Sequence, residues 1–330
     1  MAYVQPYFDL FHRSIRLSLD ESRTLQQKRE IVCNKLEDRL PAIFEAAGQE
    51  CPLFGFRNQG SYQMQTGTLP LDGDYDIDLG MYFEIDPDEY HPLELKRMVY
   101  KALKGHTKDV RIRRPCVTVQ YQQAGEPAYH VDIAIYSDGS QSRDGMPRLA
   151  LGKGRSGEKF CGWLVSDPAT LSSEILGSYE GPELTQFRRL VRYLKRWKDL
   201  RFHKTGNGAP RGIALTVASH QHFEAEFFRD GTPDDLLALI NIVRGLLGSF
   251  TLRGMSWFFG WPSHEVEIML PVEPFSNLCA RMTPRHMKRF YEELEFLLEV
   301  LEAVKSGRSD EKACQRLRDI FGDDFPLPDG

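Results

Sequence analysis

Two short runs of this chain, Gln59-Gly-Ser-Tyr-Gln-Met-Gln-Thr66 and Asp72-Gly-Asp-Tyr-Asp-Ile-Asp-Leu79, carry its most informative pattern. The first is a loop of small and polar residues, and the second alternates acidic with apolar side chains. Alternate side chains of an extended strand share one face, so Asp76 and Asp78 point the same way while Ile77 points into the core. Two carboxylates on one strand face, just after a loop suited to phosphate, are typical of a metal-dependent nucleotidyl-transfer site.

The acidic run has two other possible interpretations. A helix-loop-helix calcium site needs Gly at its sixth position and Glu at its twelfth. Counted from Asp72 these positions hold Ile77 and Phe83, and the register counted from Asp74 fails in the same way. A solvated acidic turn is the other alternative, because carboxylates are common in turns. The apolar alternation beside the carboxylates disfavours it.

A third carboxylate is expected, because two-metal sites also hold the attacking hydroxyl. The run Tyr129-His-Val-Asp-Ile-Ala-Ile-Tyr136 reads as a buried strand in which Asp132 is the only acidic residue. An acid within an apolar strand is costly unless it is paired or binds a metal. Asp132 is therefore the third candidate ligand; the alternative is a buried carboxylate satisfied by backbone donors or by an Arg.

Composition is that of an ordinary globular protein. The 330 residues suffice for two lobes, with 41% hydrophobic and 27% charged residues. The net charge of -5 favours nucleotides over long duplexes as ligands. The start lacks a signal-peptide pattern, no run could span a bilayer, and the six scattered cysteines form no zinc motif. We expect a cytoplasmic protein with reduced thiols, and a monomer because no heptad seam is visible.

The spacing of apolar residues predicts a long first helix and two differently built halves. Helical spacing runs from Ser18 to Ala47, with Asp20 as the N-cap. Strands and one helix are predicted in the first half, at 51–56, 77–83, 92–103 (the helix), 110–112, 117–121 and 130–136, and a loop at 137–145. Helices are predicted in the second half, at 187–200, 213–223, 234–250, 285–304 and 310–321.

The helix over Gln186–Leu200 has one apolar face, and Arg and Lys fill the remainder. Lys195 lies at the margin of the apolar face, from which its ammonium could reach a triphosphate. On spacing alone the better interpretation is a surface Lys whose stem lies along apolar neighbours. The neighbouring Arg residues are read as a solvated or interdomain face.

These pieces resemble a known family, the cGAS/DncV-like nucleotidyltransferases (CD-NTases) of bacterial anti-phage CBASS systems, within the polymerase-β-like superfamily. The resemblance covers nearly the whole chain. It rests on the 59–66 loop, Asp76-Ile-Asp78 and His130-Val-Asp132, and on further matches at 166–168, 188–199, 213–215 and 321–326.

The resemblance implies an α+β, two-lobed enzyme. A catalytic α/β lobe with a mixed sheet is expected over residues 1–165, a helical-bundle lobe over 166–322 and a flexible tail over 323–330. The implied reaction joins nucleoside triphosphates into a cyclic di- or trinucleotide second messenger. ATP is the favoured substrate, and GTP or a pyrimidine nucleoside triphosphate are the alternatives. Two Mg²⁺ ions, replaceable by Mn²⁺, are the implied cofactors.

The resemblance also assigns roles to residues. Asp76 and Asp78 are expected to bind both metals, while Asp132 completes one metal site and helps to activate the attacking hydroxyl. The triphosphate is expected to bind to the start of the loop and to a Lys, that is, to Gln59, Gly60, Ser61 and Lys195. This match favours the phosphate-binding interpretation of Lys195 over the surface one.

Two departures keep the product open. Met64 stands where well-known relatives carry an aromatic residue, and Arg211-Gly212 stands where they carry serines. Arg211 is a candidate contact to a base edge or a phosphate. Asn277 is a candidate contact to the acceptor nucleotide, and the alternative is a helix N-terminus capped by Ser276. No zinc-binding insertion is apparent, so activation by duplex DNA is disfavoured.

The acidic, proline-containing end of the chain is expected to be exposed and extended. Its last residue, Gly330, is compatible with conjugation by an E1/E2-like partner, as the resemblance implies for some CBASS operons. Three other functions stay open: transfer of one nucleotidyl group to another acceptor, a linear 2′–5′ oligoadenylate synthase, and a non-catalytic nucleotide-binding module. The three acids argue against the last.

Overall fold

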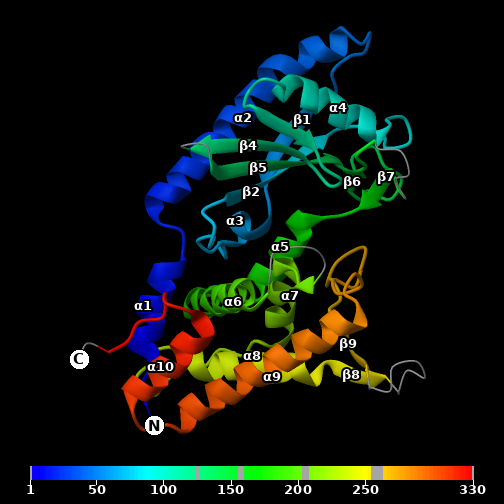
Figure 1. Cartoon of the computed structure of the whole chain (residues 1–330). Helices are drawn as coiled ribbons and strands as arrows, with labels where there is room; N and C mark the ends of the chain where they lie inside the picture. Colours follow the sequence, from blue (N-terminus) through cyan, green and yellow to red (C-terminus); the bar gives the residue numbers. More distant parts are fainter. Residues whose placement is uncertain (1, 124–125, 155–159, 203–207, 254–262, 329–330) are drawn as a thin grey trace.

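The computed structural model describes residues 2–123, 126–154, 160–202, 208–253 and 263–328. They form two lobes, a sheet-containing lobe at the top of Figure 1 and a helical lobe below it. None of the helices in these ranges is long and apolar enough to cross a membrane. The two lobes match the predicted two-lobed α+β architecture.

The described part of the upper lobe contains a seven-stranded mixed sheet in which β2 and β5 run parallel at the centre. The order is β1-β2-β5-β4-β3, and β6 pairs with both β5 and β7. The strands are β1 (Phe54–Asn58), β2 (Tyr75–Phe83), β3 (Asp109–Ile112), β4 (Val117–Gln123), β5 (Glu126–Ser137), β6 (Arg148–Leu151) and β7 (Gly162–Val165). The predicted strands are confirmed, except that β1 begins at Phe54 and that β6 and β7 were missed.

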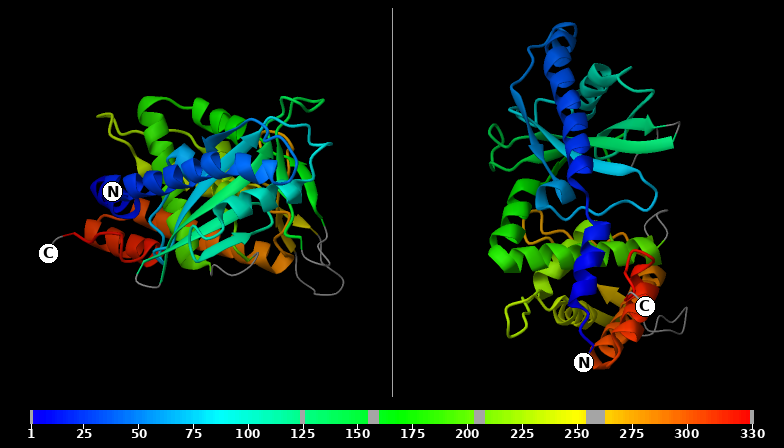
Figure 2. Two further views of the ribbon diagram at one scale, coloured as in Figure 1. Left: turned by 90° about the horizontal axis from the view of Figure 1, so that it is seen from above. Right: turned by 90° about the vertical axis from the view of Figure 1, so that its left-hand side faces the viewer.

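Two helices, α2 (Leu19–Glu45) and α4 (Pro92–Leu103), share one hydrophobic core with the sheet. The right-hand view of Figure 2 shows α2 running along the whole upper lobe. The predicted N-cap at Asp20 is wrong. Ser18 caps α2 instead, because its hydroxyl accepts from the Glu21 amide while the Glu21 carboxylate accepts from the Ser18 amide.

The lower lobe packs around the fully buried side chains of α6, among them Trp197 and Tyr193. The helices and hairpin strands are α5 (Pro168–Gly177), α6 (Gly181–Arg201), α7 (Gly212–His222), α8 (Asp235–Gly248), β8 (Phe250–Arg253), β9 (Ser263–Val266), α9 (Pro284–Ser306) and α10 (Asp310–Phe321). The five predicted helices are confirmed; α5 and the β8–β9 hairpin were missed.

Two predicted boundaries need correction, the start of the catalytic lobe at residue 1 and the start of the flexible tail at residue 323. The first helix, α1 (Gln5–Ile15), was not predicted, and it belongs to the helical lobe because Phe8 and Phe11 are fully buried against α6 and α10. The catalytic lobe therefore does not begin at residue 1. The tail is also packed at its start, since Phe325 is fully buried against Phe8 and Phe11. Gly330 lies outside the described residues.

Candidate active site

The three predicted acids come together because β2 and β5 are parallel neighbours in a fixed register. Asp78 pairs with Asp132 across the two strands, and Asp76 pairs with His130. Their side chains lie on the face opposite the core, while Ile77 and Val131 are buried on the other face. Ligand atoms of Asp76, His130 and Asp132 all lie within 4.8 Å of one another. The alternation read from the sequence therefore produces the cluster.

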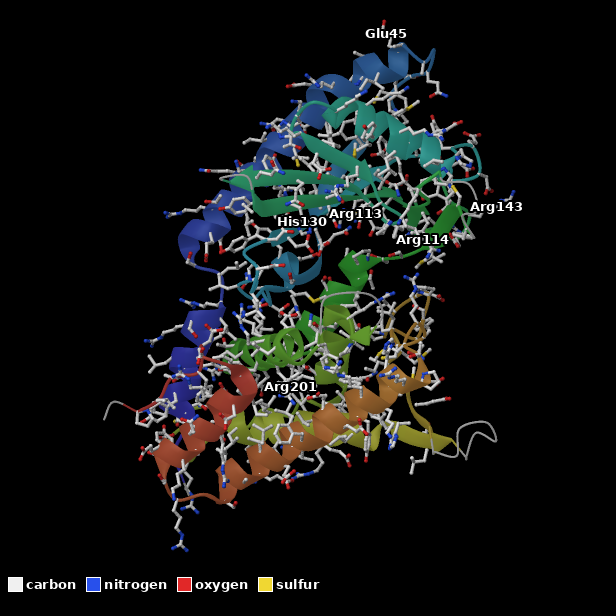
Figure 3. The ribbon with its side chains drawn as sticks, viewed as in Figure 1. Glu45, Arg113, Arg114, His130, Arg143 and Arg201 are labelled. Carbon is white, nitrogen blue, oxygen red and sulfur yellow. The ribbon has the colours of Figure 1, made fainter. Side chains whose placement is uncertain are left out.

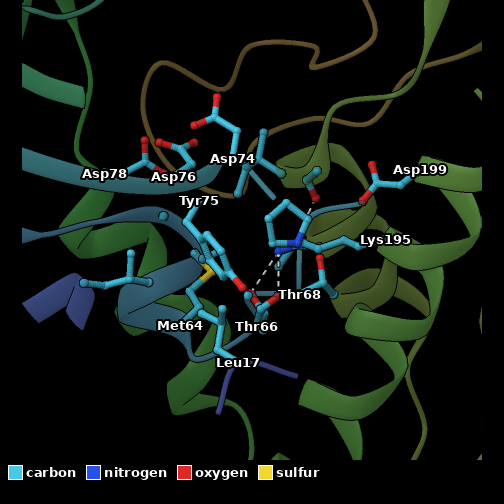
Figure 4. Close-up of a pocket in the computed structure, with 18 of the residues that line it drawn as sticks. Leu17, Met64, Thr66, Thr68, Asp74, Tyr75, Asp76, Asp78, Lys195 and Asp199 are labelled. Carbon is cyan, nitrogen blue, oxygen red and sulfur yellow. Dashed lines mark hydrogen bonds between the residues drawn. The ribbon is translucent and has the colours of Figure 1, made fainter. Parts of the chain in front are cut away.

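A cavity of about 560 Å³ opens beside this cluster, between the two lobes. Figure 4 shows the acids of β2 on one side of it and Lys195 of α6 on the other. Of the predicted site residues, the lining contains Gly60, Ser61, Asp76, Asp78 and Lys195. A cavity with acids on one wall and a cation on the other suits a ligand that carries both phosphate and metal.

The surroundings of Asp78 shift its pKa. Burial, together with the nearby charges of Asp76 and Asp132, raises its pKa to about 7. Three carboxylates in one place repel one another, and each is stabilised by a cation placed between them. The residues thus fit a hard divalent cation, which prefers carboxylate oxygens.

His130 is a site residue that sequence reasoning missed as such. Its Nδ1 lies 3.1 Å from an oxygen of Asp74, and its Nε2 lies 3.2 Å from an oxygen of Asp76. Burial disfavours the charged imidazole, but the two neighbouring carboxylates outweigh it and raise the pKa of His130 to about 9. Both ring nitrogens already contact carboxylate oxygens, so we assign His130 to holding Asp76. Its place two residues before Asp132, on the same strand face, was the available signal.

Asp132 is held by two neighbours. The Thr118 hydroxyl of β4 donates to one oxygen of its carboxylate. Arg113 lies 4.0 Å from the other oxygen. Figure 3 shows His130 and Arg113 at the edge of the sheet that faces the helical lobe. The alternative in which an Arg satisfies Asp132 thus applies in part, since Arg113 is 42% exposed and approaches the carboxylate only to 4.0 Å.

The loop after β1 folds into the short helix α3 (Gly60–Met64), whose first residue touches the acids. Gly60 has φ +59°, and a Cβ there would lie 2.1 Å from the Asp78 carboxylate. Glycine is therefore needed for both conformation and space. Gln59 does not line the cavity; its amide donates to the Tyr82 hydroxyl at 2.8 Å and accepts from the Tyr136 hydroxyl at 3.3 Å.

Lys195 reaches across from α6 to this loop. Its Nζ donates to the Thr66 carbonyl at 3.1 Å and to the Thr66 hydroxyl at 3.0 Å, as the dashed lines in Figure 4 show. Burial, followed by the charges of Lys198 and Arg192, lowers its pKa to about 7. The surface interpretation favoured by spacing alone is wrong, because the ammonium points into the cavity.

Two predicted contacts are not brought into the cavity. Arg211 precedes α7, and only the following residues of that helix line the cavity. The side-chain oxygen of Asn277 accepts from the backbone amides of Ile268 at 3.3 Å and Cys279 at 2.8 Å. The alternative role of Ser276 as a helix cap is wrong, since the next helix, α9, is capped by Thr283.

Comparison with known proteins agrees with this geometry. Residues 55–136 match the family model described as cyclic GMP-AMP synthase DncV-like, nucleotidyltransferase domain. This region is similar to the nucleotidyltransferase domain of that family. It contains Gly60, Ser61 and all three acids.

Longer alignments extend the DncV-like similarity over the chain. Over 183 residues, 52% of this chain, it is 26% identical to a cyclic GMP-AMP synthase of Escherichia albertii, and the match spans 38% of that protein. The fold resembles the crystal structure of Vibrio cholerae DncV cyclic AMP-GMP synthase, with TM-score 0.71 and 18% identity over 99% of this chain and 98% of that chain. Escherichia coli DncV in its 3′-deoxy GTP bound form gives TM-score 0.67 and 18% identity over 94% and 93%. The predicted fold class is confirmed.

Proposed function

We propose that this protein is a metal-dependent nucleotidyltransferase that condenses nucleoside triphosphates into a cyclic di- or trinucleotide and releases pyrophosphate. The observation that carries the proposal is the convergence of Asp76, Asp78 and Asp132 beside a cavity whose other wall presents Lys195. Structures of the similar Vibrio cholerae DncV include a mutant in complex with ATP and GTP, and a complex with the linear intermediate 5′ pppA(3′,5′)pG. Nucleoside triphosphates are accordingly the proposed substrates here.

The metal is proposed to be a pair of Mg²⁺ ions, which Mn²⁺ can replace. Asp76 and Asp78 would hold both ions and Asp132 would complete one site, because these are the carboxylates that converge. The ions would supply charge neutralisation at the phosphates and alignment of the two reacting oxygens. His130 keeps Asp76 in place through its 3.2 Å contact.

In the proposed reaction a ribose hydroxyl oxygen bonds to the α-phosphorus of a triphosphate, and the bond from that phosphorus to the bridging oxygen breaks. Pyrophosphate leaves with the electron pair, and Asp132 helps to remove the hydroxyl proton. Ser61 and Lys195 hold the triphosphate, since both line the cavity next to the acids. A second reaction of the same kind would close the ring. Positioning and charge stabilisation account for catalysis of this type.

The biological role proposed with this activity is synthesis of a second messenger in anti-phage defence. It rests on the likeness to cyclic dinucleotide synthases and on the family resemblance of the motifs. The test deletes the gene from its host, reintroduces either wild type or Asp76→Asn, and measures phage resistance. The proposal expects deletion to make the host sensitive, and resistance to return with wild type but not with Asp76→Asn. Equal protection by the two forms would contradict it.

The product assay tests the chemistry. Purified protein is incubated with all four triphosphates and Mg²⁺ or Mn²⁺, treated with alkaline phosphatase and analysed by mass spectrometry, with Asp76→Asn/Asp78→Asn as the control. The proposal expects a phosphatase-resistant species with the mass of a cyclic di- or trinucleotide, absent from the control. A phosphatase-sensitive chain would indicate a linear synthase. Transfer to an added acceptor alone would indicate the single-transfer alternative.

A further inference from the structure

A row of cationic side chains on α6 holds the loop that follows α3. Four consecutive backbone carbonyls, those of residues 64 to 67, each accept a hydrogen bond from this row. Arg188 donates to Met64 at 3.1 Å, and Lys195 donates to Thr66. Arg192 donates to two carbonyls at once, those of Gln65 and Gly67. Arg188, Arg192 and Lys195 are spaced so that they share one side of a helix.

The loop needs these partners. The last carbonyls of a helix find no amide donor within that helix, and α3 is only five residues long. Gln65, which follows α3, has the left-handed conformation at φ 54° that costs a non-glycine residue about 1–2 kcal/mol. Cations near a helix C-terminus satisfy such carbonyls and oppose their partial negative charge. The conformation of residues 64–67 therefore depends on α6.

Arg192 is itself held by a histidine of α1. Its Nη1 lies 3.1 Å from Nε2 of His12 in α1, which accepts the hydrogen bond. Nε and Nη2 are the two nitrogens that reach the loop carbonyls. The planar guanidinium thus joins α1, α6 and the loop in one fixed geometry, which a lysine ammonium cannot reproduce.

We propose that Arg188 and Arg192 are positioning residues that hold the 60–67 loop in its nucleotide-binding shape, with Arg192 as the principal clamp. This inference rests on the proposed function, because the loop carries Gly60 and Ser61. The basic face of α6 is then neither a solvated surface nor a nucleic-acid patch. It is an internal support for the phosphate side of the site, built from the helical lobe.

The test compares three lysine variants: Arg192→Lys, Arg188→Lys and, as the matched control, Arg201→Lys. Arg201 lies on the same helix but pairs with Glu293 of α9 at 2.6 Å, within the helical lobe (Figure 3). Amide hydrogen exchange of residues 60–70 is measured without nucleotide, and KM and kcat are measured for the triphosphates. Exchange in β2 and α8 serves as the internal reference for overall stability.

We expect Arg192→Lys to speed amide hydrogen exchange at residues 60–70 about tenfold and to raise the KM for the triphosphates about tenfold. The reason is that at least one charged hydrogen bond is lost. Arg188→Lys should change both less, because a lysine can replace its single bond to Met64. Arg201→Lys should change neither.

Two results would overturn the proposal. One is equal exchange at 60–70 in all three variants and wild type. The other is faster exchange in Arg192→Lys throughout β2 and α8 as well, which would mark Arg192 as a general stabiliser. If wild type bound no triphosphate, the proposed function would fail, and the exchange measurement would still decide whether the clamp exists.

Discussion

The acidic face of β2 and β5 and the cationic face of α6 meet at the same cavity, yet they differ in how their charges are satisfied. The acids crowd together, and burial with mutual repulsion raises the pKa of Asp78 to about 7. The cations of α6 already donate to carbonyls of the 64–67 loop. One face is arranged to receive cations, and the other supports the loop beside it.

The difference teaches which charges carry the chemistry. A buried charge that the protein leaves among like charges is a candidate for function, whereas one satisfied by backbone partners is a candidate for structure. Lys195 belongs to both groups, because it is hydrogen-bonded to Thr66 and still lines the cavity. The predictions below test this division, from the largest expected effect to the smallest.

Removing a carboxylate should abolish turnover and stabilise the fold. Asp78→Asn is expected to lower kcat at least about 10³-fold, as loss of a metal ligand removes charge stabilisation of the transition state. The pKa of Asp78 is higher in the folded than in the unfolded chain, so the folded state loses stability as the pH rises from about 4 to about 7, and the full cost is present above pH 7. The melting temperature of metal-free Asp78→Asn at pH 8 should therefore exceed that of wild type. A melting temperature below wild type would contradict the repulsion described here.

Crowding the acids should be nearly as damaging. Gly60→Ala places a Cβ 2.1 Å from the Asp78 carboxylate, which must then move. We expect about a 10²-fold loss of activity, in keeping with the sensitivity of catalysis to small displacements. Gly105→Ala is the matched control, because Gly105 has φ +79° with nothing within 4 Å of a Cβ. Equal activity losses in the two variants would assign the effect to backbone strain.

Metal affinity should depend on pH. Protons compete with the metal for Asp78, and with a pKa of about 7 its ionised fraction rises roughly tenfold between pH 6 and pH 8. Mn²⁺ binding to the nucleotide-free protein, followed by electron paramagnetic resonance, should tighten by about this factor. Asp78→Asn should bind weakly and with a flatter pH profile. His130 stays protonated over this range, since its pKa is about 9.

The smallest effect is expected at Asn277. Its side-chain oxygen serves two backbone amides and lies outside the cavity lining, so Asn277→Ala should cost about 1 kcal/mol of stability. Triphosphate KM should change less than about twofold, within the scatter expected for indirect effects. A tenfold rise in KM with an unchanged melting temperature would restore Asn277 as a nucleotide contact.

The catalytic acids could be predicted from sequence because their signal is local. Alternation within each strand places Asp76, Asp78 and Asp132 on the right face, and an apolar strand around an acid marks it as unusual. Their meeting needed only that the two strands be neighbours. The role of His130 could not be predicted in this way, because it depends on Asp76 of another strand and on Asp74 just before that strand.

The support of the site could not be predicted in the same way. Arg188 and Arg192 lie more than 120 positions from the carbonyls they hold, and basic residues on a helix are usually solvated. Helix α1 was missed although it is strongly amphipathic, and its place in the helical lobe follows from Phe8 and Phe11 packing against distant aromatic residues. Gln59 looked like a ligand contact, but its partners, Tyr82 and Tyr136, are brought to it by the sheet.

The most direct test of the central claim is a crystal structure with Mn²⁺ and a non-hydrolysable triphosphate, in which anomalous scattering locates the manganese. The account predicts manganese bound by oxygens of Asp76, Asp78 and Asp132, with the triphosphate between Ser61 and Lys195. Manganese bound through His130, or a triphosphate placed away from Lys195, would contradict it.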